Sequence, residues 1–204
     1  LRTFIENITP FFDDILIHKS VEVASSLADA YGCKIVETLD SPSIARERYD
    51  EFVARSFLVY QFGLEAEKAI DNPKIHRSKR TGRIGWIYDG TIPMASLRAR
   101  DFIIIPRIEL AKALHKLLPN SNMRVVIDKT AEPFVREGKS VFAKFVQSAW
   151  EGIRSGDEVL VVSETGDLVG TGTAMLAPLE MLHFKKGIAV KTREGLNKPS
   201  LVAC

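Results

Sequence analysis

The stretch from residue 156 to residue 176 reads GDEVLVVSETGDLVGTGTAML. It holds two apolar runs rich in β-branched residues, on either side of Thr165, Gly166 and Asp167. Such runs, separated by a turn that contains glycine, predict two antiparallel strands joined as a hairpin. The GTGTA portion is not a phosphate-binding loop, because no Gly-Lys-Ser/Thr follows it and the segment has the pattern of a strand.

Further short strands are predicted on both sides of this hairpin. MRVVID precedes it and GIAVKTRE follows it, with short helices predicted for TAEPFVREG and APLEMLHFKKG. Many short strands with tight turns and little helix indicate a small closed barrel, which we place over residues 123–197.

The segment before the barrel mixes helices and strands. IARERYDEFVARSFLVYQFG is predicted to be a long helix, because its aromatic and apolar residues recur at spacings of three and four, and GLEAEKAI continues as a second helix. KIHRS and RIGWIYDG are predicted strands on either side of a basic turn, and Asp89-Gly90 indicates a hairpin. DFIIIP is a further strand, and PRIELAKALHKLLP an amphipathic helix with Pro106 in its first turn and Pro119 beyond its end.

The N-terminal segment is predicted to hold a helix over residues 20–31 and a strand at CKIVET. ITPFFDDILI is either a buried strand or an exposed apolar patch that docks a partner. The predicted fold class is α+β, with small α/β domains followed by the barrel. We expect an N-terminal α+β domain over residues 1–45, a basic α+β domain over residues 46–122 and the barrel domain over residues 123–197.

The charges are unevenly distributed along the chain. Residues 73–127 hold 11 Lys and Arg against 3 Asp and Glu, whereas residues 1–72 hold 7 against 13. A concentrated positive field of this kind attracts a polyanion.

Four of the basic residues lie within one short run: Arg77, Lys79, Arg80 and Arg83. Such side chains bind phosphate independently of sequence, through counterion release. The backbone N–H groups of Thr81 and Gly82 are expected to contact a phosphate as well. Arg98 and Arg100 are two residues apart, so on an extended segment they share a face and lengthen the basic track. The alternative is a solvated surface.

Other classes of site are not indicated. The two cysteines, Cys33 and Cys204, are far apart, which argues against a disulfide framework and favours a reducing cytoplasm. The four histidines are scattered, and no H-x-x-x-H or C-x-x-C motif occurs, so we expect no metal site, no cofactor and no catalytic residue. No apolar run is long enough to span a membrane, and the N-terminus lacks the pattern of a signal peptide.

Two segments resemble known domains. Residues 124–146, 156–176 and 184–195 carry, in order, G-K-x-V-F-x-K, G-D-E-V, G-x-G-x-A and G-x-A-V-K-x-R, and they resemble the PUA domain, an RNA-binding module that folds as a pseudo-barrel. Residues 60–102, with YQFG, HRSKRTGRI and LRARDF, resemble the domain that precedes PUA in archaeal (archaeosine) tRNA-guanine transglycosylases. The family's catalytic domain is a TIM barrel with a zinc site. The eightfold alternation of strand and helix does not fit in these 204 residues, and the sequence has no cysteine cluster for the zinc.

The resemblance also implies a binding groove in the barrel domain, which receives the 3′ CCA end of tRNA. In this groove Gly138 lets the backbone approach the RNA, and Phe142 either stacks on a base or fills the core, the core being favoured. The cations expected to line or flank it are Lys139, Lys144, Lys191 and Arg193.

The leading hypothesis is a tRNA-binding, non-catalytic subunit of a split archaeosine transglycosylase, in which the exchanged base is guanine 15 of tRNA. The expected partners are the acceptor stem and D-arm of tRNA and a separate catalytic chain, with neither DNA nor a membrane. The alternatives are a chain related to archaeosine synthase, a fragment of an intact transglycosylase, and a free-standing RNA-binding protein in rRNA or ribosome maturation.

Overall fold

The computed structural model describes residues 16–18, 34–36, 42–118 and 122–197. The chain divides into two compact units, residues 1–49 and 50–204. In the first unit, strands β1 (Leu16–His18) and β2 (Lys34–Val36) pair in parallel, which confirms the strand predicted at CKIVET. The helix predicted over residues 20–31, most of the ITPFFDDILI segment and both cysteines lie outside the described residues.

The second unit begins within a long helix, α3 (Pro42–Phe62), as the three-four periodicity predicts. Ala54, Leu58 and Phe62 recur every fourth residue and are buried, so they form the face that packs on the protein core. The predicted second helix is a 3₁₀ helix, η2 (Leu64–Ala69), which starts after Gly63 with a φ of 95°.

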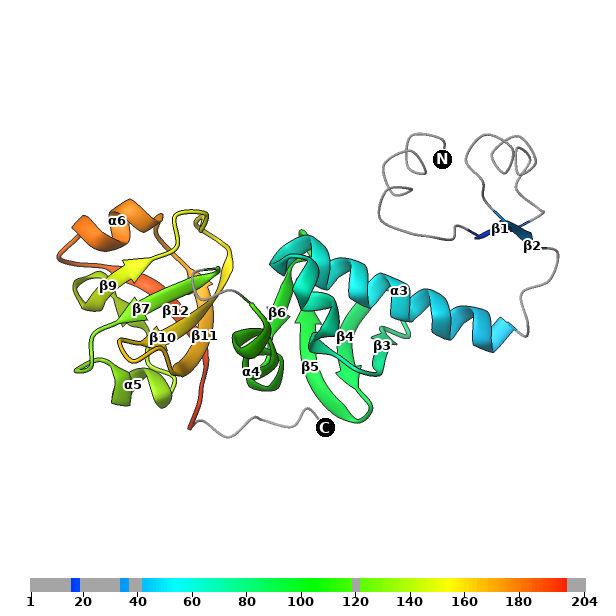
Figure 1. The fold of residues 1–204 in the computed structure, drawn as a ribbon, viewed down its shortest axis with the longest axis horizontal. Coiled ribbons are helices and arrows are strands. Elements are labelled where there is room, and N and C mark those ends of the chain that lie inside the picture. Colours follow the sequence, from blue (N-terminus) through cyan, green and yellow to red (C-terminus); the bar gives the residue numbers. More distant parts are fainter. Residues whose placement is uncertain (1–15, 19–33, 37–41, 119–121, 198–204) are drawn as a thin grey trace. The chain divides into compact units, whose positions relative to one another are not determined.

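A four-stranded antiparallel sheet lies against α3, which runs across one of its faces (Figure 1). Its strands are β3 (Pro73–Arg77), β4 (Ile84–Asp89), β5 (Ile92–Leu97) and β6 (Ile104–Pro106), in that order. The hairpin predicted at Asp89-Gly90 joins β4 to β5, and Gly90 has a φ of 59°. The next helix, α4 (Ile108–Leu117), begins later than predicted, because Pro106 ends β6 instead of opening the helix.

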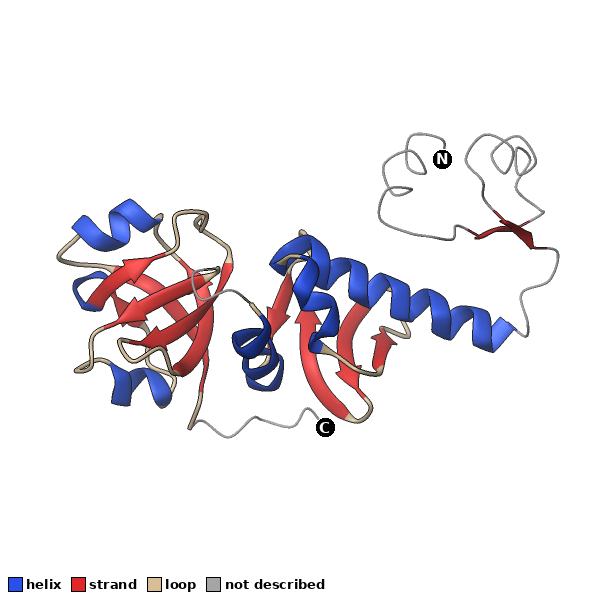
Figure 2. Ribbon diagram, in the orientation of Figure 1, coloured by secondary structure: helices blue, strands red, loops and turns tan. Residues whose placement is uncertain are grey.

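The barrel predicted from the opening stretch is present as a six-stranded sheet that nearly closes on itself (Figure 2). Its strands are β7 (Arg124–Ile127), β8 (Val141–Phe142), β9 (Val146–Ala149), β10 (Glu158–Ser163), β11 (Leu168–Ala174) and β12 (Ile188–Gly195). They pair in the order β8-β12-β11-β10-β7-β9, and only β10 and β7 pair in parallel. Helices α5 (Glu132–Arg136) and α6 (Pro178–His183) lie on opposite sides of this sheet in Figure 1, and η3 (Ala143–Phe145) follows β8. The α+β fold class is confirmed.

The two glycines of the GTGTA segment serve strand packing. A Cβ on Gly170 would lie 2.6 Å from the Glu194 carbonyl oxygen, and one on Gly172 would lie 2.6 Å from the Lys191 carbonyl oxygen. β12 therefore approaches its neighbour β11 so closely that no side chain fits at either glycine. The interpretation of this segment as a strand is confirmed.

The sheet domain and the barrel share one apolar cluster. Leu160 and Leu168 of the barrel are buried in the same cluster as Leu110 and Leu114 of α4. The Arg124 side chain donates to the carbonyl oxygens of His115 (2.8 Å) and Leu118 (3.3 Å), near the C-terminus of α4. None of the described helices is both long enough and apolar enough to cross a membrane.

His115 makes this junction sensitive to acid. Burial, followed by the positive charge of Arg124, lowers its pKa below the ordinary value of 6.5, although Asp167 and the Gly166 carbonyl act in the opposite direction. The unfolded chain therefore binds more protons than the folded one just below pH 6.5, and stability falls as the pH falls through that value. Urea titrations should show that the free energy of unfolding is lower at pH 5.5 than at pH 7.5, and that this decrease is smaller in the His115→Gln variant. An equal decrease in the unchanged protein and in the variant would contradict the role of His115.

The end of α5 depends on a glycine. Gly138 has a φ of 85°, its N–H donates to Val135 O (2.8 Å) and the next N–H, of Lys139, donates to Phe134 O (3.0 Å), which is the Schellman arrangement. We expect Gly138→Ala to cost about 1–2 kcal/mol of unfolding free energy, because L-residues are strained at positive φ. Gly85→Ala is the matched control, since its Cβ would meet only His76 O at 3.7 Å. Equal urea midpoints for the two variants would show that the α5 end tolerates a side chain.

Candidate nucleic-acid interface

The basic turn between β3 and β4 presents its cations to solvent. Lys79, Arg80 and Arg83 are exposed, whereas Arg77 is turned inward and its guanidinium forms a 2.6 Å ion pair with Asp50 of α3. Because this pair is partly buried, Arg77 contributes less to the outward-facing field than the other three. Of the four cations in this run, three are exposed on the surface and Arg77 attaches the turn to α3.

The backbone N–H groups of this turn are not free to bind a phosphate as predicted. The N–H of Thr81 faces Ser78 Oγ (3.4 Å), that of Gly82 donates to Ser78 O (2.8 Å), and that of Arg83 faces Thr81 Oγ1 (3.4 Å). The expectation that the Thr81 and Gly82 N–H groups contact a phosphate is wrong in this conformation, since both already have acceptors. The long side chains are what the turn offers an anion.

Arg98 and Arg100 do not lie on an extended segment. Strand β5 ends at Leu97, and both arginines belong to the turn before β6, closed by hydrogen bonds between Arg98 N and Ile103 O (2.9 Å) and Phe102 N and Arg98 O (2.8 Å). Arg98 is directed inward with a side chain 19% exposed, and Arg100 outward at 80%. The predicted shared face is therefore wrong, and Arg100 alone of the two is open to a ligand.

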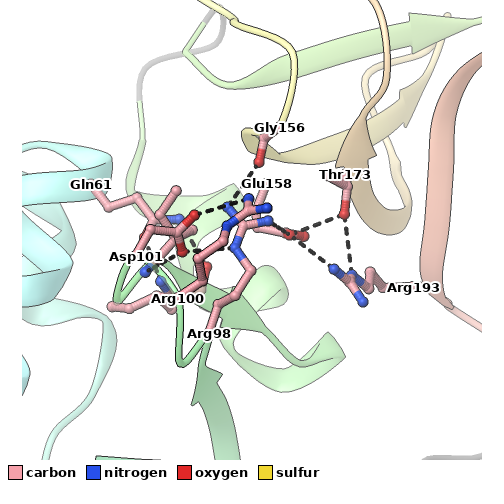
Figure 3. A network of polar contacts seen from close by, with 10 residues as sticks. Gln61, Arg98, Arg100, Asp101, Gly156, Glu158, Thr173 and Arg193 are labelled. Carbon is pink, nitrogen blue, oxygen red and sulfur yellow. Dashed lines mark hydrogen bonds and ion pairs between the residues drawn. The ribbon is translucent and has the colours of Figure 1, made fainter.

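Arg98 reaches the barrel (Figure 3). It donates to the Gly156 carbonyl (3.2 Å) and to the Asp101 carboxylate (2.8 Å), and its other guanidinium nitrogen lies 3.7 Å from Glu158 Oε1. The Arg98 hydrogen bond is the main cause that lowers the pKa of Asp101. The arginine therefore joins the two domains, a role that its position in the basic run does not reveal.

Arg193 of β12 meets the same carboxylate from the other side. Its guanidinium lies 3.4 Å from Glu158 Oε1 and donates to Thr173 Oγ1 (3.2 Å), while Thr173 itself donates to Glu158 (3.0 Å), as Figure 3 shows. Lys191 is exposed and lies opposite Thr173 in the sheet, so it is on this side of β12. Arg193 is thus directed to the domain junction and not, as predicted, to the groove near Lys139.

The opposite side of β12 faces the predicted groove. Thr192 donates to the Lys139 carbonyl (2.8 Å), and Ile188 pairs with Phe142 across β12 and β8. Lys139 is exposed and follows Gly138, which has a positive φ at the end of α5.

Phe142 does not fill the core. Its side chain is 47% exposed, and its neighbour Ile188 is 42% exposed, so the preferred interpretation of Phe142 as a core residue is wrong. Lys144 is exposed as well, and its ammonium lies 4.7 Å from the centre of the Phe145 ring. An exposed aromatic ring between lysines is the combination that binds unpaired nucleotides, by stacking and by charge.

Three groups of predicted residues result. Lys79, Arg80 and Arg83 lie on the turn between β3 and β4; Arg98 and Arg193 lie at the domain junction, whereas Arg100 and Lys191 are exposed; and Gly138, Lys139, Phe142 and Lys144 lie on the segment from the end of α5 to η3. Sequence reasoning missed Glu158, a charged residue at the start of a buried strand, and Ile188, which follows the Lys185-Lys186-Gly187 run. Within the described ranges, no three His, Cys, Asp or Glu side chains are placed to hold a metal ion.

Comparison with known proteins assigns both domains. A family model for the patch-forming domain C2 of tRNA-guanine transglycosylase matches residues 53–121, and a PUA domain model matches residues 123–196. The tRNA-guanine(15) transglycosylase of Methanobrevibacter smithii is 38% identical over 200 residues, 97% of this chain and 30% of the relative. That of Pyrococcus furiosus is 46% identical over 139 residues, 68% of this chain and 24% of the relative. The chain thus spans less than a third of the length of these relatives.

Solved structures agree on the fold. A hypothetical protein from Pyrococcus horikoshii superposes with a TM-score of 0.56 at 28% identity, over 72% of this chain and 90% of its own. A conserved PUA domain protein from Thermoplasma acidophilum gives a TM-score of 0.51 at 23% identity, over 76% and 91%, which shows a common fold alone. Residues 53–121 and 123–196 are therefore the C2 and PUA domains found in the C-terminal part of archaeal tRNA-guanine(15) transglycosylases.

Proposed function

We propose that this chain is the tRNA-binding, non-catalytic subunit of a split archaeosine tRNA-guanine transglycosylase. The observation that carries the proposal is that residues 53–121 and 123–196 match the C2 domain of tRNA-guanine transglycosylase and the PUA domain. In the proposal, a separate catalytic chain carries out the base exchange. We further propose linking, basic and PUA domains over residues 1–45, 46–122 and 123–197, and a cytoplasmic location, where tRNA is modified.

The chemistry of the surface supports RNA as the ligand. Three exposed cations on one turn attract phosphates, and an exposed phenylalanine within a short segment that also carries two exposed lysines is suited to unpaired bases. In the proposed complex the PUA groove holds the acceptor end, while the turn contacts the backbone elsewhere on the same tRNA. A subunit of this kind accelerates base exchange at guanine 15 by binding and positioning the tRNA, without a catalytic group of its own.

Reconstitution tests the function directly. The chain is mixed with a transglycosylase catalytic chain that lacks the C2 and PUA domains, unmodified tRNA and radiolabelled guanine, and incorporation of label into tRNA is followed. We expect this chain to raise the exchange rate at subsaturating tRNA, because it adds binding energy for the substrate. A tRNA with position 15 changed to adenine is the control. If label enters tRNA equally fast with and without this chain, the proposed function is overturned.

Reversal of the turn charges tests the RNA contact. In the variant Lys79→Glu, Arg80→Glu, Arg83→Glu, tRNA affinity should fall about tenfold or more, and the slope of log K against log salt should decrease by roughly 1 per lost phosphate contact. Arg77 is left unchanged because it is paired with Asp50.

The matched control reverses three exposed lysines elsewhere in the same domain, Lys68, Lys112 and Lys116, so that net charge changes equally. Binding is measured by fluorescence anisotropy over a range of salt concentrations. Equal effects of the two triple variants would mean that the turn acts only through net charge and makes no contact.

A further inference from the structure

We infer that Glu158 and Glu194 are positioning residues: they fix the C2 and PUA domains at one spacing, so that the basic turn and the PUA groove bind the same tRNA simultaneously. The inference rests on the proposed function for the identity of the ligand. The fixed spacing itself rests on contacts between the two domains, and it can be tested separately.

Glu194 ties three elements together. One carboxylate oxygen of this β12 residue accepts from Ile108 N (2.9 Å), the first N–H of α4, and the other pairs with Arg107 Nε at 2.5 Å. The N-cap residue of this helix, Arg107, makes no side-chain cap hydrogen bond. The Glu194 carboxylate of the PUA domain therefore accepts a hydrogen bond from the N-terminus of α4, a helix of the C2 domain, where the helix dipole favours a negative charge. Arg107 in turn lies over the Trp86 ring, 5.6 Å from its centre, which extends the contact to β4.

Glu158 provides a second point of attachment. Its side chain is fully buried, and it faces Arg98 of the C2 turn and Arg193 of β12 (Figure 3). Its Oε2 has no hydrogen-bond partner among the described residues. A buried charge that is incompletely satisfied adds little net stability compared with an apolar side chain. It does, however, penalise any arrangement of the domains that separates it from Arg98 of C2, since Arg193 alone then remains beside it, and so it favours one geometry.

A fixed spacing matters because the ligand is bound at two places. When two contacts lie on one rigid body, the second forms at a high effective concentration once the first is made. If the domains move independently, part of that gain is lost in ordering them at each binding event. The apolar cluster shared by Leu160, Leu168 and α4 keeps the domains together, and the two glutamates determine their relative orientation.

The test compares a long ligand with a short one. The variant Glu158→Gln, Glu194→Gln is assayed by anisotropy against whole tRNA and against an acceptor-stem minihelix with its CCA end, which is short enough to occupy the PUA groove alone. We expect affinity for tRNA to fall about tenfold, and affinity for the minihelix to stay within about twofold. Removal of two negative charges by itself strengthens RNA binding, so weaker binding cannot be a charge effect.

The matched control is Glu151→Gln, Glu164→Gln, which removes two exposed acidic side chains from the same domain. Spin labels at Glu65→Cys and Glu137→Cys, on a chain with Cys33→Ser and Cys204→Ser, report the distance between the domains by electron resonance. The distance distribution should broaden in the junction variant and stay narrow in the control. Circular dichroism melts verify that both variants are folded.

The outcomes separate the two proposals. A narrow distance distribution in the junction variant would overturn the role of Glu158 and Glu194. A broad distribution with unchanged tRNA affinity, or an equal loss for tRNA and minihelix, would overturn the importance of spacing. Failure of the unchanged chain to bind tRNA would overturn the proposed function, whatever the labels report.

Discussion

The contact between helix α4 and the PUA domain is the constraint on which the rest of the second unit depends. Leu110 and Leu114 are buried together with Leu160 and Leu168, so neither domain completes its apolar surface alone. The polar contacts around this core are specific: a carboxylate from β12 at the helix start, and Arg124 at the helix end. Of the candidate residues, Arg98 and Arg193 lie at the junction between the two domains, where both face Glu158.

Much of the fold was predictable because its signals are local. The β-branched runs on either side of Thr165-Gly166-Asp167, the Asp89-Gly90 hairpin and the periodicity of α3 each depend on neighbours within a few residues. The boundary at Pro106 was wrong for a tertiary reason. The residue pairs with Ala95 across β5 and β6, and this pairing extends the strand where propensity alone favours the start of a helix.

The candidate site was less predictable, since its chemistry depends on partners that are distant in sequence. Nothing near Arg98 indicates that it faces Glu158, 60 residues further along the chain, or that Arg193 approaches the same oxygen. Likewise, Phe142 sits in an apolar run but at an edge where only Ile188 lies opposite it, which leaves the ring exposed. The sequence identifies a Lys or Arg as a candidate RNA contact, but its partners in the folded protein determine whether the side chain is available to a ligand or stabilises the fold.

The two glycines of β11 control the position of charged residues on the neighbouring strand β12. Gly170 and Gly172 let β12 pair closely with β11, and β12 carries Arg193 and Glu194. One methyl group at either glycine would push β12 outward and shift both charged side chains together. Under the proposed function, weaker tRNA binding is therefore expected from substitutions in β11 that contact neither the RNA nor the C2 domain.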